Sequence, residues 1–258
     1  MRKPLQILVA GMCLSLLSWA GGAFAAPIVF DLTQFGPMTP DPQASHNNHQ
    51  AMEEEGLRVD ITGWNLPNLT NGTFRQSQIN FYDFGVGTCN PQEGLDRTPG
   101  PDDTCSTFSP IEHPIDNMNS TSGFDGFDFI LFEFGAPVWL IEAEIDIWSG
   151  DSDVTWYSGA GDFPTLLGRT LAQANLGPAS FDYGGAGDAN FMRTVDLFNN
   201  RELVTWLLFG ADTGLGRAFN DFDDAIKIRS LTVPIPSSLF VISGFIGLGI
   251  WGRMSRST

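Results

Sequence analysis

The chain has 258 residues, of which 30 are acidic and 13 basic, so its formal net charge at pH 7 is −17. Four of the basic residues lie in the two terminal segments. The rest of the chain has 9 basic and 30 acidic residues, a net charge of −21. Such a surface repels nucleic acid and anionic lipid, so neither is an expected partner of the body, whereas divalent cations and neutral glycans are compatible with it.

The N-terminal segment has the layout of a secretory signal peptide. Arg2 and Lys3 precede an apolar run from Leu5 to Trp19, and Ala23-Phe24-Ala25 follows as an A-x-A cleavage site. A buried N-terminal helix is the alternative interpretation. We expect residues 1–25 to be the signal, residues 26–232 to form one extracellular domain, and residues 233–258 to form a separate C-terminal signal.

Strand patterns dominate the body, where runs of Val, Ile, Phe and Trp are separated by clusters of Gly, Pro, Asn and Asp. With 29 glycines, 16 prolines and no visible repeat, we expect an all-β fold, an antiparallel β-sandwich of jelly-roll-like type. The predicted strands are Ile28–Leu32, Leu57–Trp64, Gln78–Phe84, Phe127–Phe134, Val138–Trp148, Val154–Ser158, Arg193–Asp196, Val204–Ala211 and Ala225–Val233.

Other segments of the body differ from this pattern. Gln43–Glu55 and Leu166–Leu176 are the two segments in which we expect short helices. From Asn90 to Gly126 the chain is a long polar loop region, and loops of this length in compact domains are usually functional or mobile.

Because the signal peptide predicts export, we expect the cysteines of the body to be in an oxidising compartment. Of the three, Cys13 leaves with the signal, and Cys89 and Cys105 remain as a pair. In an oxidising compartment a disulfide is the expected state, and closing such a loop contributes roughly 3 kcal/mol by restricting the unfolded chain. A metal-binding or catalytic thiol pair is the weaker alternative, because no Cys-x-x-Cys motif or nearby His cluster accompanies it.

Acidic and amide side chains gather at the boundaries of the predicted strands, where Asp128, Asp221, Asp223 and Asp224 are among them. Calcium takes about six to eight oxygen ligands, which loops rich in Asp, Asn and Gly supply. The alternative is that these residues only form turns, since no EF-hand or Asp/Gly repeat is present. One expectation is thus a structural Ca²⁺, with the candidate ligands Asp116, Asn117, Asp125, Asp151 and Asp153.

Signals for catalysis are weak. The chain has no G-x-S-x-G or H-E-x-x-H motif, and its glycine-rich segments lack the helix and basic residue of a phosphate loop. His46 and His49 lack an acidic partner at fixed spacing for a shared metal, and His113 is unsupported as a general base. We expect no enzyme activity; a secreted hydrolase acting on glycan with paired carboxylates is the alternative.

Aromatic side chains near strand ends are candidates for stacking against sugar rings. Core packing is an equally good interpretation of each of them. The candidates are Trp64, Trp139, Trp148, Trp156, Tyr157 and Tyr183.

The C-terminal apolar run, Leu239–Trp251, has 13 residues, against about 20 for a helix that crosses the hydrocarbon core. Val233-Pro234-Ile235-Pro236 precedes it, and Arg253 and Arg256 follow it, which is the positive-inside arrangement of an exported protein. This three-part layout resembles the PEP-CTERM sorting signal in its Val-Pro-x-Pro variant, with Ile235 in place of the usual Glu. The resemblance implies a membrane helix over 239–252 and an exosortase-type membrane protease/transpeptidase as partner.

The body is similar to exosortase-dependent surface proteins. The similarity lies in Asp83-Phe-Gly-Val-Gly, His113-Pro-Ile-Asp-Asn117 before the Phe127–Phe134 strand, Val138-Trp-Leu and Asp151-Ser-Asp-Val-Thr155. It implies a bacterial protein, tethered to the membrane by its C-terminus before processing and then displayed on the cell surface or released into an exopolysaccharide matrix or biofilm. A structural or adhesive role that includes glycan binding is therefore the expected function.

Overall fold

The computed structural model describes residues 26–33, 49–82, 85–89, 115–117, 126–150, 152–184, 192–198, 202–214 and 224–234. Residues from Ile28 to Val233 form one compact unit. The expected signal helix and the helix over 239–252 lie outside the described residues. In the part that is described, no helix is both long and apolar enough to cross a bilayer.

Within these residues, 13 strands belong to one sheet, and the strand pairs are antiparallel. The expected all-β antiparallel fold is confirmed. In chain order the strands are β1 (Ile28–Asp31), β2 (His49–Glu54), β3 (Leu57–Leu66), β4 (Arg75–Tyr82), β5 (Gly85–Cys89), β6 (Ile115–Asp116), β7 (Phe127–Val138), β8 (Glu142–Gly150), β9 (Val154–Gly159), β10 (Ser180–Asp182), β11 (Met192–Asp196), β12 (Val204–Ala211) and β13 (Asp224–Val233).

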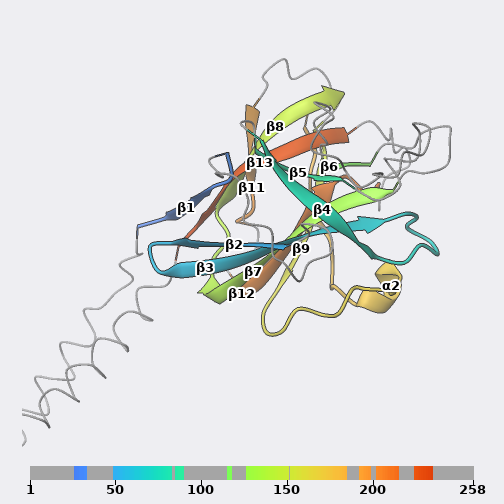
Figure 1. Ribbon diagram of the computed structural model, residues 1–258, viewed down its shortest axis with the longest axis horizontal. Helices are drawn as coiled ribbons and strands as arrows, with labels where there is room; N and C mark the ends of the chain where they lie inside the picture. The colour runs from blue at the N-terminus through green and yellow to red at the C-terminus, as the bar shows by residue number, and fades with distance from the viewer. Residues whose placement is uncertain are drawn as a thin grey trace, which may run out of the picture. The chain divides into compact units, whose positions relative to one another are not determined.

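The sheet curls into a nearly closed barrel with the strand order β10-β9-β12-β7-β3-β4-β5-β13-β8-β11. Strands β1 and β6 pair with β13, and β2 pairs with β3. Figure 1 shows β8, β13 and β11 on one side of the domain and β3, β7 and β12 on the other. The two sides are joined by β4, whose first half pairs with β3 and whose second half pairs with β5.

At this corner the backbones of β3 and β4 approach closely, at Gly63. A Cβ atom on Gly63 would lie 2.7 Å from the carbonyl oxygen of Ser77 and 2.9 Å from Cγ2 of Ile79. Both distances are shorter than a carbon can tolerate, so the position requires glycine.

The helix expected over Gln43–Glu55 is a wrong prediction for its described part. His49–Glu54 is strand β2, and each of its six residues pairs with β3. The connecting residues, Glu55 and Gly56, have φ values of 49° and 80°. Positive φ at both positions is what a two-residue hairpin loop of type I′ requires, so the turn selects strand pairing over the helical pattern.

The second expected helix is present but short. In place of Leu166–Leu176, α2 spans Leu171–Ala174. Thr170 caps its N-terminus in a capping box with Gln173, and Asn175 ends it in the left-handed conformation, at φ 52°.

The segment that contains α2 covers one face of the sheet. Alternate residues of β3, β7, β9 and β12 contribute aromatic and aliphatic side chains to this face, as their period of two requires. Leu166, Ala174 and Leu176 pack against them. The other residues of β7 and β12, such as Ile130, Phe132 and Phe209, are buried on the opposite face. Strand Phe127–Phe134 is therefore buried on both sides, as predicted.

Candidate functional site

The two candidate sites lie at opposite ends of the paired strands β9 and β12. Their register pairs Val154 with Ala211 at one end and Gly159 with Trp206 at the other. The first end holds a cluster of buried polar residues, and the second holds a surface pocket.

The buried polar cluster is centred on Asn117 and Asp224. Asn117 Nδ2 donates to Asp224 Oδ2 at 2.6 Å and to the carbonyl of Asp212 at 2.8 Å, and the Asp224 amide donates to Asn117 Oδ1 at 3.0 Å. The Asp153 amide donates to Asp224 Oδ1 at 2.9 Å. All four residues are at most 1% exposed, so these bonds replace water that the groups lose on folding.

A second set of bonds extends the cluster along β9. Thr155 Oγ1 donates to Asp212 Oδ1 at 2.9 Å and accepts from the Thr213 amide at 3.0 Å. Burial, which disfavours the phenolate, raises the pKa of Tyr157 to about 12; the charge of Asp212 adds to this rise, and the Thr213 hydroxyl opposes it. Tyr157 therefore stays neutral at physiological pH.

This cluster contains two of the five residues that the sequence offers as calcium ligands. Asn117 and Asp153 lie in it, Asp116 is half-buried in β6, and Asp125 and Asp151 lie outside the described residues. The amide of Asn117 is engaged by Asp224 on both its nitrogen and its oxygen.

Among all the residues that the structure describes, no group of three or more acidic, His or Cys residues is arranged to hold a metal ion. The calcium site stays a prediction. Asp212 was not predicted for the cluster, although it lies at the boundary of a predicted strand as the other acidic residues do.

The pocket at the opposite end of β9 and β12 has a volume of about 190 Å³. Its buried lining residues are apolar: Leu140, Trp156, Leu197 and Val204. The remaining lining residues lie at the surface or are half-buried: Trp139, Ser158, Gly159, Ala160, Pro178, Ser180, Phe198, Glu202 and Leu203.

The pocket thus combines an apolar floor with a polar and aromatic rim. Phe198 and Leu203 are 41% and 40% exposed, so the lining presents apolar surface to solvent. Glu202 is the one ionisable residue in the lining. A concave site with a few polar groups around apolar surface is typical of small-molecule and sugar recognition, and barrel mouths are a common place for it.

The predicted sugar-stacking aromatics separate into different environments. Trp139 is half-buried in the pocket lining, and Trp156 forms part of its floor, stacked on Phe209 with ring centroids 6.3 Å apart. Trp64 and Tyr157 belong to the core.

Tyr183 lies away from the pocket lining. It is 48% exposed and stacks on Phe181 at 6.0 Å. The side chain of Trp148 is outside the described part of the chain.

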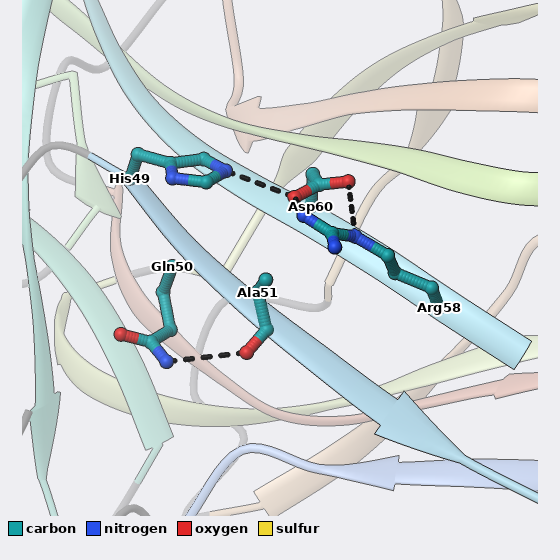
Figure 2. A network of polar contacts seen from close by, with 5 residues as sticks. All are labelled: His49, Gln50, Ala51, Arg58 and Asp60. Carbon is teal, nitrogen blue, oxygen red and sulfur yellow. Dashed lines mark hydrogen bonds and ion pairs between the residues drawn. The ribbon is translucent and has the colours of Figure 1, made fainter. Parts of the chain in front are cut away.

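A separate polar network lies on the β2–β3 hairpin (Figure 2). His49 Nε2 lies 2.9 Å from Asp60 Oδ1, while Arg58 donates to both oxygens of Asp60, at 2.6 and 2.9 Å. The bonds from Arg58 are the main reason that the pKa of Asp60 is lowered. Both oxygens of Asp60 accept hydrogen bonds from Arg58, so the network stabilises the hairpin. The other two histidines, His46 and His113, lie outside the described residues.

Glu133 is the register partner of Asp60 on β7. Partial burial, together with the charge of Asp60, raises the pKa of Glu133, and His49 opposes this rise. The pKa values of two neighbouring carboxylates are therefore displaced in opposite directions.

The predicted disulfide and sorting residues lie at the boundary of the described structure. Cys89 ends β5, and Cys105 is outside the described residues, so the disulfide stays a prediction. Val233 is the last residue of β13, fully buried and paired with Ile28, and Pro234 is buried beside it. Ile235 and Pro236 are not among the described residues.

Comparison of the chain with family models, curated proteins and solved structures gives no match.

Proposed function

We propose that the chain is an exported, exosortase-sorted protein of the cell surface or extracellular matrix, with a structural or adhesive role in which it binds exopolysaccharide. The signal layout and the Val-Pro-Ile-Pro tail support export and sorting. The observation that carries glycan binding is the pocket around Trp139 at the mouth of the barrel.

The pocket offers both kinds of contact that a sugar ring needs. The C–H face of a pyranose packs against aromatic surface, which Trp139 and Phe198 supply at the rim. Ser158, Ser180 and Glu202 supply hydroxyl and carboxylate groups that hydrogen-bond to sugar hydroxyls. Because the floor is formed by buried residues from several elements, the site is largely formed before a ligand arrives.

Binding is favoured over the alternative, hydrolysis. Glycosidases of both stereochemical classes use two carboxyl groups on either side of the scissile bond. The described lining holds one, that of Glu202. The acidic pair of Asp60 and Glu133 lies on another surface, and Asp60 is occupied by Arg58.

The arrangement of the strands in two layers is also part of this proposal. We propose a jelly-roll-like sandwich whose two layers, β10-β9-β12-β7-β3 and β5-β13-β8-β11, are continuous through β4. The division of the strand pairs on either side of β4 supports it.

Sorting is tested by intact-mass analysis of the exported protein from cells with and without the exosortase. We expect loss of a C-terminal fragment that begins near residues 233–236 only when the exosortase is present. An uncut C-terminus in both strains would refute the sorting assignment and would leave glycan binding untouched.

Glycan binding is tested with the exported protein and the polysaccharide of the producing cells. We expect saturable binding in a sedimentation assay and no release of reducing ends on long incubation. Release of reducing ends would favour the hydrolase, and absence of binding would overturn the proposed function.

A further inference from the structure

We infer that the barrel-mouth pocket binds one sugar residue that carries a free amino group. This inference rests on the proposed glycan binding and names the chemical class of the ligand. It is carried by the size of the pocket, by the nature of its single ionisable residue and by the charge of the chain.

The size of the pocket limits the ligand to about one ring. Its volume of about 190 Å³ is below the range of roughly 300–1,000 Å³ that is usual for drug-sized ligands. Buried residues, Leu140, Trp156 and Leu197, close its floor. The pocket therefore fits the end of a glycan chain or a single-residue branch, and not the middle of an extended chain.

The charge of the lining selects among sugars of this size. Glu202 is its one ionisable residue, and the lining includes neither Lys nor Arg. The formal net charge of the chain, −17, places this carboxylate in a field that is negative overall. Uronic acids and sulfated sugars would be repelled, whereas an ammonium group gains attraction both from Glu202 and from the surrounding field.

The composition of the rim strengthens the preference for a cation. Glu202 shares the lining with the exposed apolar side chains of Phe198 and Leu203. The indole of Trp139, in the same lining, attracts an ammonium group through the cation–π interaction.

The test compares the trisaccharide of β-linked glucosamine, which is cationic, with its N-acetylated counterpart, which is neutral and carries an acetyl group on each nitrogen. Calorimetric titration of the exported protein is done at mildly acidic pH, which keeps the amino groups of the probe protonated. We expect the amino trisaccharide to bind roughly fivefold more tightly, the upper end of what an exposed ion pair supplies. This advantage should shrink as the salt concentration rises.

Two variants distinguish the effect of Glu202 on this preference from the effect of the overall negative charge of the chain. In Glu202→Gln the fivefold preference should be lost, because the carboxylate is removed with little change in shape. In Glu54→Gln, an equal change of charge at an exposed position of β2 outside the lining, the preference should persist.

The outcomes distinguish this inference from the proposed function. Equal binding of both trisaccharides, or a preference that survives Glu202→Gln, would overturn the inference while glycan binding stands. If neither trisaccharide binds but the native polysaccharide does, the amino-sugar assignment is wrong. If no glycan binds at all, the proposed function fails as well.

Discussion

Arg193 of β11 donates from Nη1 to Oδ1 of Asp182 of β10 at 2.9 Å. These two strands are the ends of the sheet path, so the ion pair links the two open edges of the barrel. The same guanidinium donates from Nε to the Ser152 hydroxyl at 2.8 Å and from Nη2 to the Ser152 carbonyl. Three directed bonds from one side chain therefore substitute for the missing strand pairing.

Replacement of Arg193 by Met should lower the free energy of unfolding by about 1–3 kcal/mol, because it removes several charge-assisted bonds and keeps most of the side-chain volume. Denaturant titration measures the change. Arg75→Met, at an exposed position of β4, is the matched control and should change stability little. An equal effect of both substitutions would show that Arg193 does not close the barrel.

The buried bond between Asn117 and Asp224 predicts a strong effect of an isosteric change. In Asn117→Asp, an oxygen replaces the Nδ2 group that lies 2.6 Å from Asp224 Oδ2. A donor becomes an acceptor beside a carboxylate, without water to separate them, so the loss of stability at pH 7 should reach about 3–5 kcal/mol.

Acid should partly reverse this loss, because a shared proton restores a hydrogen bond between the two carboxyl groups. Chemical unfolding at neutral and mildly acidic pH measures the recovery. Asn71→Asp, the same change at an exposed position of the turn before β4, should leave stability nearly constant. A small effect of Asn117→Asp that is independent of pH would contradict the buried cluster.

The carboxylates of Asp60 and Glu133 predict opposite pH effects on stability. The pKa of Asp60 is lowered, so its contribution is present above the ordinary aspartate pKa and is lost as the pH falls through the lowered value. The pKa of Glu133 is raised, so folding favours its protonated form, and the associated stability is lost as the pH rises through the raised value.

Asp60→Asn should therefore be less stable than wild type at pH 7, whereas Glu133→Gln should be more stable. Both differences should shrink towards about pH 3, below the ordinary pKa values of the two side chains. Thermal unfolding across this pH range measures them. Changes of the same sign in the two variants would rule out the opposite displacements.

The strands that the sequence predicts correctly are those with many apolar residues, such as Val204–Ala211, whose bounds agree with β12. Strand β2 was missed because its composition, His-Gln-Ala-Met-Glu-Glu, has no period-two apolar pattern; its pairing with β3 and the turn at Glu55 and Gly56 determine its structure. Strands β6 and β10 have two and three residues, too few for any pattern. Tertiary pairing, and not local propensity, makes them strands.

The site was predictable only in part for a similar reason. Acidic residues at strand boundaries indicated a polar cluster, but which of them meet depends on how β6, β9, β12 and β13 end at the same side of the barrel. Trp139 and Trp156 were candidates for sugar stacking; both lie in the pocket lining, Trp139 half-buried and Trp156 buried, and sugar stacking stays a prediction. Glu202 carried no signal, because a single exposed acid in a loop has no pattern.

We propose that the protein binds glycan through the pocket around Trp139. The most direct measurement is the affinity of the wild-type protein and of Trp139→Ala for the polysaccharide of the producing cells, with Leu167→Ala as the control, an exposed apolar residue outside the lining. We predict that Trp139→Ala weakens binding by about tenfold, the effect of about 1.4 kcal/mol of lost stacking, while a cooperative unfolding transition shows that the variant is still folded. Equal affinity of Trp139→Ala and wild type would contradict the account.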